Sequence, residues 1–404
     1  MAGGCCVYLY LQKYTHLSMG MLYLYHMIIG IDASRLSENK RTGVEWYAFF
    51  VIEKLKKLLV NKDITVRLYC REPLKKDVLD VMPDNWEVIQ LDWPPKRLWT
   101  QIRFSWEMWR QAPDVLFIPA HVPPLIHPKK TVVMIHDIAA KTYPESYNFF
   151  ERWYSLWSAK YTLEKMSDVL SPSNFTKKQL EKLLPANDIF AQIHVIPHGY
   201  DTKFGDVIEE KKQETILDTY HIKKPYILSV SRLEEKKNTL SIISAFERYK
   251  ERTGDKDLSL VLVGKAGYGY EKVKEAMDTS TYKKDIYELG WIEQGDLPAI
   301  MQGAQVFLFP SLYEGFGLPV LEAMAAGVPV ICSRGLSFED IAGHAAFYVD
   351  PTDVGQMVDN LYILLRNREE RKRVITEGKM QAMKFSWEST AKKTAEVLLD
   401  NPLP

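Results

Sequence analysis

The sequence predicts an α/β fold made of two doubly wound domains, each with a parallel sheet between layers of helices. Three observations support this prediction: a length of 404 residues, two successive series of short β-branched runs that alternate with amphipathic segments, and a polar stretch between the series. A single hydrophobic core rarely grows beyond about 250–300 residues, so a chain of this length is expected to form two domains. Strands that alternate with helices pair in parallel sheets.

The runs predicted as strands form two groups, which place one domain at residues 27–205 and another at 223–385. Residues 206–222 between them are polar and charged, as is typical of a linker. The first group comprises "IIGID" (28–32), "ITVRLYC" (64–70), "DVLFIP" (114–119), "TVVMIHD" (131–137), "DVLSPS" (168–173) and "IHVIPHG" (193–199). The second comprises "PYILSVSR" (225–232), "LSLVLVG" (258–264), "DIYELGW" (285–291), "VFLFPS" (306–311), "PVICS" (329–333) and "AFYVDP" (346–351).

Residues 1–26 precede the first predicted strand and are apolar and aromatic. They lack a basic start and a small-residue cleavage site, and they are too short for a spanning helix. Because a strand begins at "MIIGIDAS", we interpret residues 1–26 as a leader or an upstream extension, with Met27 as the natural start.

Composition and charge narrow the classes of function. Apolar residues make up 46% of the chain and charged residues 26%, and Lys+Arg and Asp+Glu both number 52. A chain without net charge has no global attraction for nucleic acid, so we expect no nucleic-acid partner. The cysteines, Cys5, Cys6, Cys70 and Cys332, form neither a metal-ligand spacing nor a disulfide framework, which favours a cytoplasmic location.

Ligands of open parallel sheets bind at the carboxyl ends of the strands, and this rule selects the candidate site residues. In the first domain, His136 and Asp137 follow one predicted strand, and Gly43 lies in a polar turn after another. In the second domain, Arg232 and Gly264 follow two strands. A histidine in such a place is either a substrate contact or a buried interdomain residue, and both interpretations stay open for His136.

Arg232 and Lys237 lie in "SRLEEKKN", next to a predicted helix start. Two cations beside free backbone amides and a helix dipole can hold a diphosphate. The alternative is a solvated charge cluster, because Glu234 and Glu235 lie between the two cations.

The run "SLYEGFGLPVLEAMAAGVPVICS" at 311–333 holds two acids on either side of a glycine turn. Pro319 and Gly327 bracket a predicted helix with Glu322 in its first turn, where the carboxylate can accept two hydroxyls, as a ribose offers them. Glu314 stays in the loop before the turn. Without a ligand, Glu322 is simply an acid at a helix start and Glu314 a loop acid.

Part of this run, "EGFGLPVLEAMAAGVPVICS", resembles the signature of the retaining glycosyltransferases of family 4, enzymes of the GT-B fold whose mark is two glutamates separated by seven residues. The segments "IGIDASRLSENKRTGVEWY", "IHD", "LSPSNFTKKQL", "VIPHGYD" and "SVSRLEEKKN" match the family in order. The end "FSWESTAKKTAEVL" resembles the helix that crosses back to the first domain in this fold, which assigns residues 386–404 to that helix and a tail. The resemblance covers about residues 27–400.

The resemblance implies two facing domains with a nucleotide sugar in the cleft between them. The domain at 27–205 would be on the acceptor side, and the domain at 223–385 would bind the nucleotide sugar. Glu322 would bind its ribose, and Glu314 would lie near the donor sugar. The amides of Phe316, Gly317 and Leu318 would face sugar hydroxyls or phosphate.

The resemblance also assigns the charged and first-domain residues. Arg232 and Lys237 would neutralise the diphosphate leaving group, Gly43 would pass close to the phosphates, and His136 would contact donor sugar or acceptor. The candidate catalytic residues are therefore His136, Arg232, Lys237 and Glu314, and the donor-binding candidates are Gly43, Gly264, Phe316, Gly317, Leu318 and Glu322.

The expected activity is retaining transfer of a hexose, mannose or similar, from a nucleotide-diphosphate sugar to a glycan or lipid-linked acceptor. We expect no cofactor, and also no metal, since we find no Asp-x-Asp motif of the kind that holds a divalent ion on a nucleotide sugar. Two other classes stay open: a GT-B-fold partner subunit without turnover, and a nicotinamide-dependent oxidoreductase. The latter needs G-x-G-x-x-G after a strand, whereas "GKAGYGYE" has glycines at 264, 267 and 269.

Residues 94–110, "PPKRLWTQIRFSWEMWR", have an apolar stripe at helical spacing beside four basic residues and one acid. This pattern is the profile of a basic amphipathic helix that could lie on the inner face of a membrane, but an apolar helix face more often packs inward, so packing of the stripe into the core is favoured. Residues 149–165 are also aromatic, and there a core or acceptor-cleft role is favoured. The stripe comprises Leu98, Ile102, Trp106 and Trp109, and the charges are Lys96, Arg97, Arg103, Arg110 and Glu107.

Overall fold

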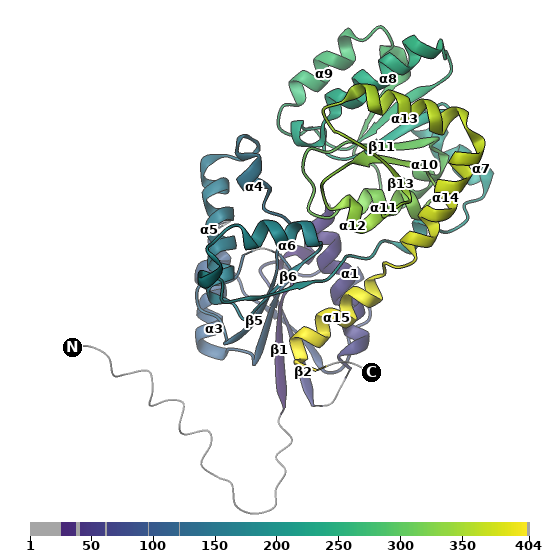
Figure 1. Ribbon diagram of the computed structural model, residues 1–404. Helices are drawn as coiled ribbons and strands as arrows, with labels where there is room; N and C mark the ends of the chain where they lie inside the picture. The colour runs from purple at the N-terminus through teal and green to yellow at the C-terminus, as the bar shows by residue number, and fades with distance from the viewer. Residues whose placement is uncertain (1–25, 38–40, 61–62, 96, 121, 402–404) are drawn as a thin grey trace, which may run out of the picture.

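The computed structural model describes residues 26–37, 41–60, 63–95, 97–120 and 122–401. It contains two parallel sheets, one in each domain, with helices on both faces (Figure 1). The predicted α/β fold with two doubly wound domains is thereby confirmed. The predicted leader lies outside the described residues, apart from His26.

The first-domain sheet has seven parallel strands in the order β3-β2-β1-β4-β5-β6-β7. Central strands are buried on both faces, and Ile29 of β1 pairs with Val66 on one side and Val115 on the other. The sequence prediction missed β3, a short edge strand in which, after the buried Trp86, half-buried and exposed residues alternate. The strands are β1 Met27–Asp32, β2 Ile64–Cys70, β3 Trp86–Gln90, β4 Val115–Ile118, β5 Lys130–Met134, β6 Asp168–Ser171 and β7 Gln192–Val195.

Helices cover both faces of this sheet. One face packs against α1 and the C-terminal helix α15, whose apolar side chains share a core with β1 and β2. The other face packs against η2, α3, α5 and α6. The helices are η1 Ser34–Ser37, α1 Gly43–Leu58, α2 Lys76–Leu79, η2 Trp99–Phe104, α3 Ser105–Gln111, α4 Ala139–Thr142, η3 Pro144–Ser146, α5 Phe149–Lys165, α6 Asn174–Glu181, η4 Ala186–Asp188, η5 Thr202–Phe204 and α15 Trp387–Leu399.

The second-domain sheet has six parallel strands in the order β10-β9-β8-β11-β12-β13. Its faces carry two further cores, one with α10, α11 and α12 and one with α8, α9 and α13. The strands are β8 Tyr226–Val230, β9 Ser259–Val263, β10 Ile286–Gly290, β11 Val306–Phe309, β12 Val330–Ser333 and β13 Ala346–Val349. The helices are η6 Glu235–Lys237, α8 Thr239–Thr253, α9 Tyr270–Thr279, η7 Lys283–Asp285, α10 Leu297–Gly303, α11 Leu318–Ala325, α12 Phe338–Ala342, α13 Val354–Arg366 and α14 Arg368–Ala382.

The stretch predicted as a linker, residues 206–222, contains helix α7, Glu210–Thr219. Leu217 and Ile222 are buried in a core of the second domain, and Gln213 Nε2 donates to Ala299 O at 3.1 Å. The prediction of a plain linker was therefore incomplete, because this polar segment carries enough apolar side chains to dock on the domain that follows it.

Helix α15 crosses back to the first domain, as the resemblance implied, and lies beside α1 (Figure 1). The crossing needs close approach of two backbones: a Cβ on Gly199 would lie 2.1 Å from Trp387 N. Trp387 then stacks on Phe50 of α1 with ring centroids 5.2 Å apart. Only glycine at position 199 leaves room for the returning segment.

Residues 94–110 do not form one amphipathic helix. Leu98 has a left-handed backbone with φ of 65°, and a π-helix, η2, then leads into the short α3. The predicted apolar stripe nevertheless exists, and it points to solvent: Ile102 is 47% exposed, Trp106 54% and Trp109 65%. The favoured prediction, that this stripe packs into the core, is therefore wrong, since Trp99, Phe104 and Met108 fill that role.

A second exposed stripe lies at the start of α5, the aromatic-rich segment 149–165. A loop between the two helices joins the stripes, because Leu125 N donates to Ser105 Oγ of α3 at 3.0 Å and Tyr161 Oη of α5 donates to Leu125 O at 3.1 Å. We call the combined region the aromatic surface. It comprises Leu98, Ile102, Trp106, Trp109, Leu125, Ile126, Phe149, Phe150 and Trp153, all exposed.

Candidate active site

A cavity of about 460 Å³ lies between the two domains, at the carboxyl ends of their strands. We call it the interdomain cavity. Five of the residues predicted from the sequence line it: Gly43, Arg232, Gly264, Leu318 and Glu322. They come from four loops and helix starts that are far apart in the chain, so the carboxyl-edge rule selected a set that the fold brings together.

Two helix N-termini face each other across this cavity. Gly43 is the first residue of α1, and a Cβ on it would lie 3.9 Å from Cδ1 of Leu318, the first residue of α11. A capping box between Thr42 and Glu45 fixes the start of α1. The first amides of a helix have no partner within the helix, and together with the helix dipole they form a site for anions.

Backbone geometry at two glycines shapes the second-domain side of the cavity. Gly317 has φ of 105°, and a Cβ there would lie 2.5 Å from the ring of Phe338. Gly264 has φ of 142°, and a Cβ there would lie 1.8 Å from Ser231 O. Both positions therefore need glycine. Gly264 itself lines the cavity, and Gly317 caps the helix whose first residue, Leu318, lines it.

Arg232 follows β8 and lines the interdomain cavity with a side chain that is 63% exposed. Its nearest acid is Glu234, at 3.8 Å from Nε, and Glu234 also lies 3.3 Å from Lys236 Nζ. The Arg232 guanidinium is thus only loosely paired, which leaves most of its donors available to a ligand. Both predictions for Arg232, a diphosphate contact and a solvated charge, agree with this exposed position.

Lys237 and Glu314 are paired with each other. Lys237 Nζ donates to Glu314 Oε2, and the ammonium also lies 5.6 Å from the centroid of Phe309. Neither residue is among those that line the interdomain cavity. The pair links the end of η6 to the loop before α11, so it holds the start of the glycine turn.

Glu322 lines the interdomain cavity from the second turn of α11. The prediction that it lies in the first turn was wrong, because the helix begins at Leu318, with Gly317 as its N-cap. Burial raises the pKa of Glu322 to about 8, and the nearby carboxylate of Asp201 adds to the shift. The free protein at neutral pH therefore holds this carboxyl mostly protonated.

His136 is buried and does not line the interdomain cavity. Its Nε2 lies 2.9 Å from Pro119 O, which can only accept, so Nε2 carries the proton. Its Nδ1 lies 3.2 Å from His198 Nε2, which then donates. Burial and the neighbouring His136 lower the pKa of His198 well below its usual value. The interdomain interpretation of His136 agrees with this geometry, and its catalytic role stays a prediction.

The glycine turn of the second domain rests directly on the first domain. Gly315 O accepts hydrogen bonds from Ser173 Oγ at 2.6 Å and Thr176 Oγ1 at 3.0 Å. A Cβ on Gly315 would lie 2.2 Å from His136 O, so the backbones meet here. Phe316 is buried and packs on His198 with ring centroids 4.7 Å apart. These contacts hold the amides of the turn in place.

Metal ligands do not cluster in the part of the chain that the structure describes. One Asp-x-Asp sequence is present, at Asp255 and Asp257, but it lies in the turn before β9, at the end of the strand opposite the interdomain cavity. Asp255 Oδ1 accepts from the amides of Asp257 and Leu258, both at 3.1 Å, so this acid caps a turn.

Comparison with known proteins places this site in a family. A model described as Glycosyl transferases group 1 matches residues 209–381, and a model described as Glycosyltransferase Family 4 matches residues 43–204. The chain belongs to these glycosyltransferases. The predicted family is confirmed. The two family models meet between residues 204 and 209, in the segment that joins the first sheet to the second.

Two curated relatives of this glycosyltransferase are mannosyltransferases by name. O-antigen chain mannosyltransferase B of Escherichia coli is 29% identical over 274 residues, which cover 66% of this chain and 69% of that protein. The MMP alpha-(1->4)-mannosyltransferase of Mycolicibacterium hassiacum is 30% identical over 210 residues, 51% of this chain and 48% of that protein.

Solved structures confirm the GT-B architecture of the glycosyltransferase. Sucrose-phosphate synthase from Thermosynechococcus elongatus matches with a TM-score of 0.71 at 17% identity, over 93% of this chain and 98% of that one. WaaG, a glycosyltransferase involved in lipopolysaccharide biosynthesis, matches with 0.69 at 16% identity, over 92% and 99%. Anabaena HepE in complex with UDP and glucose matches with 0.69 at 15% identity, over 93% and 99%.

The structure also adds residues to the site of the glycosyltransferase. Lys265 and Trp291 line the interdomain cavity, with the Lys265 ammonium 4.7 Å from the centroid of the Trp291 ring. Trp46, Trp387 and Asp201 line it from the first domain, the returning helix and the segment between the domains. Trp291 directly follows β10, so the carboxyl-edge rule could have found it. Trp387 lies far along the chain and gave no such signal.

Proposed function

We propose that this glycosyltransferase moves a hexosyl group from a nucleotide-diphosphate sugar to a glycan or lipid-linked acceptor, with retention of the anomeric configuration and without a metal ion. The observation that carries the proposal is the meeting of two helix N-termini with the loosely paired Arg232 in one cavity. Such a site suits a diphosphate, which gains charge as the glycosyl bond breaks.

The proposed reaction breaks the bond between the anomeric carbon and the diphosphate oxygen. The acceptor hydroxyl attacks the anomeric carbon from the face that the diphosphate leaves, and its proton passes to a departing phosphate oxygen. The arginine and the free amides stabilise the negative charge that remains on the diphosphate. Closure of the two domains excludes water, which would otherwise hydrolyse the donor.

The carboxyl group of Glu322 is proposed to receive the two ribose hydroxyls of the donor. It lies on the second domain, in the same cavity as Arg232, so one nucleotide can reach both groups. Lys237 and Glu314 are proposed to lie beside the donor sugar. There, Lys237 adds positive charge near the diphosphate. His136 is proposed to position the glycine turn through its backbone contact with Gly315.

Mannose is the proposed hexose, because relatives that match more than half of this chain are mannosyltransferases by name. The acceptor is proposed to be a saccharide of a cell-envelope polysaccharide. The third class considered from the sequence, an oxidoreductase, finds no support in a chain of this family.

A peripheral contact with the inner face of a membrane belongs to the same proposal. The aromatic surface is exposed, and Arg97, Arg103 and Arg110 lie within or beside its first stripe. Aromatic side chains flanked by basic ones are typical of surfaces that enter the headgroup layer of an anionic membrane. None of the helices in the described ranges is long and apolar enough to cross a bilayer.

The proposal is tested by thermal unfolding of the purified protein with GDP, UDP, ADP or dTDP, each with and without EDTA. A ligand at 100 times its dissociation constant stabilises a protein by about 2.7 kcal/mol. We expect one nucleotide to raise the Tm regardless of EDTA, and Glu322→Ala and Arg232→Ala to weaken that effect. The anomeric configuration of the product, read by NMR, then tests retention.

Two outcomes would contradict this proposal. If EDTA abolishes the shift and a divalent ion restores it, transfer without a metal is wrong. If no nucleotide changes the Tm of a folded sample, the partner subunit without turnover becomes the better explanation.

A further inference from the structure

A buried histidine, His198, lies behind the wall of the interdomain cavity. It is 3% exposed and directly precedes Gly199, which the backbone of the returning segment approaches closely. The next two residues, Tyr200 and Asp201, line the cavity, whereas His198 is not among the lining residues. Any contribution of His198 to the site must therefore pass through its neighbours. No role in the reaction described above has been given to it.

Four aromatic rings from four separate segments pack against the imidazole of His198. Tyr47 comes from α1, with ring centroids 4.6 Å apart, and His136 follows β5, at 5.3 Å. Phe316 comes from the glycine turn, at 4.7 Å, and Trp387 begins α15, at 5.8 Å in a stacked arrangement. One side chain therefore contacts both domains and the helix that returns from the second domain to the first.

Three of these four segments also form part of the interdomain cavity. Helix α1 begins at Gly43, four residues before Tyr47, and α11 begins at Leu318, two residues after Phe316. Gly43 and Leu318 line the cavity, and Trp387 lines it directly. The two helix N-termini proposed to hold the diphosphate belong to different domains, so their separation depends on contacts between the domains. The imidazole touches both helices close to those N-termini.

The hydrogen bonds of His136 and His198, which we call the histidine pair, run in one direction only. Pro119 O can only accept, so His136 holds its proton on Nε2, and its Nδ1 accepts from His198 Nε2 at 3.2 Å. The reverse tautomer of either histidine would set two acceptors against each other. Both ring nitrogens of His136 are thus committed to protein partners, and neither is left to bind a substrate.

Both members of the histidine pair are neutral. Burial, with His136 beside it, lowers the pKa of His198 well below its usual value. His198 Nδ1 is buried and has no hydrogen-bond partner among the groups that the structure describes, so a proton there would be a charge without an acceptor. His136 accepts at Nδ1 and is therefore neutral as well. The pair cannot act as a cation towards the diphosphate, which leaves a role in positioning.

Backbone contacts hold the segments on either side of the imidazole. Thr390 Oγ1 of α15 donates to Pro197 O at 2.7 Å, which ties residues 197–199 to the returning helix. A Cβ on Gly315 would lie 2.2 Å from His136 O, so the glycine turn rests on the end of β5. The histidine pair joins these two anchored segments. Loss of the hydrogen bond between them would free the glycine turn to shift relative to α1 and α15.

We propose that His198 is a positioning residue for sugar transfer. Through its hydrogen bond to His136 and its packing on Phe316, it fixes the glycine turn and the start of α11 relative to the start of α1. It touches neither donor nor acceptor. The proposal rests on the transferase function proposed above, and it names the residue that sets the distance between the two helix ends at the diphosphate.

The proposal predicts which kinetic constant changes. The nucleotide is placed on the second domain, at Arg232 and Glu322, and these contacts do not involve His198. Stabilisation of the departing diphosphate by the start of α1 grows as the glycosyl bond breaks. Loss of the histidine pair should therefore lower kcat and leave the KM for the donor nearly unchanged.

The test uses two variants that each keep one half of the side chain. His198→Gln retains an N–H that can donate to His136 but loses the ring, whereas His198→Phe retains a ring but loses the donor. The assay is hydrolysis of a nucleotide sugar, with whichever of GDP-mannose, UDP-glucose, ADP-glucose and dTDP-glucose the wild type hydrolyses fastest.

We expect the two variants to differ in kcat. In His198→Phe, kcat should fall about tenfold, because a buried acceptor on His136 loses its partner. In His198→Gln, which keeps that bond, kcat should stay within about threefold of the wild-type value. The KM for the donor should change by less than about twofold in both variants.

Further variants show whether the histidine pair acts as a unit. His136→Phe should lower kcat by about the same factor as His198→Phe, and it tests the same hydrogen bond if His198→Phe does not fold. The double variant should be no slower than the slower single variant. His344→Phe is the matched control, since His344 is exposed on the second domain. The Tm of each variant with and without the nucleotide shows that it is folded and binds donor.

Four results would overturn the proposal. The first is a normal kcat in His198→Phe, and the second is a larger loss of kcat in His198→Gln than in His198→Phe. The third is a loss that falls on the donor KM, and the fourth is a double variant in which the two single losses multiply. A failure of the transferase function itself looks different, because the wild type would then neither hydrolyse a nucleotide sugar nor gain Tm from a nucleotide.

Discussion

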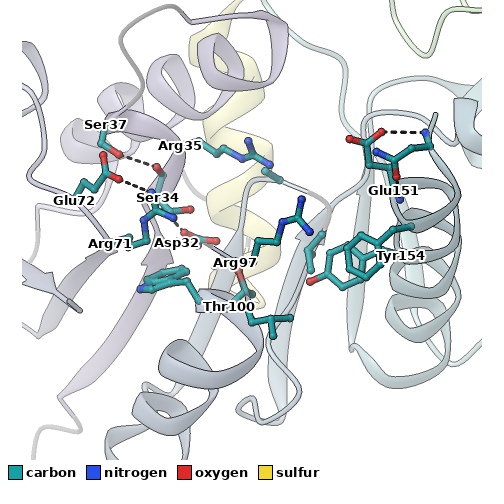
Figure 2. A pocket seen from close by; sticks show the side chains of 16 residues that line it. Asp32, Ser34, Arg35, Ser37, Arg71, Glu72, Arg97, Thr100, Glu151 and Tyr154 are labelled. Carbon is teal, nitrogen blue, oxygen red and sulfur yellow. Dashed lines mark hydrogen bonds and ion pairs between the residues drawn. The ribbon is translucent and has the colours of Figure 1, made fainter. Parts of the chain in front are cut away.

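The interdomain cavity differs in its lining from a second cavity of about 750 Å³ that lies within the first domain, the first-domain pocket (Figure 2). Main-chain groups contribute to the interdomain cavity through two helix N-termini and Gly264, beside side chains such as Arg232 and Glu322. Side chains shape the first-domain pocket, with charges and rings from five separate segments of the chain. The main-chain groups suit the diphosphate that all nucleotide sugars share, whereas a pocket made of side chains alone can change in sequence while the fold stays the same.

Among the variants considered, Arg232→Ala should give the largest effect. It tests the role given to the interdomain cavity. Turnover should fall about 100- to 1,000-fold, because one preorganised charge on the leaving group is lost. A steady-state assay with saturating donor measures this, and Arg248→Ala serves as the control, since Arg248 is exposed on α8 of the second domain. Near-normal turnover in Arg232→Ala would remove the arginine from the mechanism.

The second prediction uses the carboxyl of Glu322, whose pKa burial raises to about 8 in the free protein. The deprotonated form accepts the ribose hydroxyls, and its fraction grows as the pH rises towards the pKa. The deprotonated fraction rises from about 1% at pH 6 to about half at pH 8, so nucleotide affinity should increase about 50-fold over this range. Calorimetric titration at several pH values measures the affinity. In Glu322→Gln, the rise of nucleotide affinity with pH should shrink to the part that comes from ionisation of the nucleotide's own phosphate. If this variant has the same pH profile as the wild type, the assignment of Glu322 is wrong.

The aromatic surface should respond more weakly, because its contacts are spread over many side chains. Trp109→Ala should lower binding to phosphatidylcholine vesicles that contain phosphatidylglycerol by about fivefold, since only part of the ring leaves water. Flotation of the vesicles measures the bound fraction. Tyr362→Ala is the matched exposed aromatic on the second domain, and an equal loss in that variant would argue against a specific face.

The smallest effect is expected at Asn238, between η6 and α8. Its backbone is left-handed, with φ of 59°, and its Nδ2 donates to Pro310 O at 3.0 Å and Pro351 O at 2.6 Å. Asn238→Gly should lower the free energy of unfolding by only about 1 kcal/mol, because glycine suits this backbone while the hydrogen bonds are lost. Urea unfolding measures the change. A much larger loss would mean that the side chain anchors the second-domain site.

The fold could be predicted well because its signals are local. Buried parallel strands read as short β-branched runs, and each run predicted in the sequence corresponds to a strand. The edge strand Trp86–Gln90 was missed, since half of its residues face solvent and leave no continuous apolar run. Helix α7 was missed in the predicted linker, because its single fully buried residue, Leu217, gives little periodicity.

The interdomain cavity was predictable for the same reason as the strands. Arg232 and Gly264 each follow a strand closely, and Gly43 begins the first long helix after β1, so the sequence alone places them at one edge. The first-domain pocket gave no such signal. Its charges come from loops and helix starts that only tertiary packing brings together. The stripe around Trp106 likewise had two interpretations, membrane or core, and only the burial of Trp99 and Phe104 in the structure distinguishes them.

The return of α15 to the first domain has a consequence for synthesis of the chain. Trp387, Ala391, Ala395 and Leu398 complete the core around β1 and β2, which are made among the first strands. Domains usually fold in the order in which they leave the ribosome. Here the amino-terminal domain must wait with one apolar face uncovered until the whole second domain has been translated, so we expect a nascent chain without its last helix to stay on chaperones.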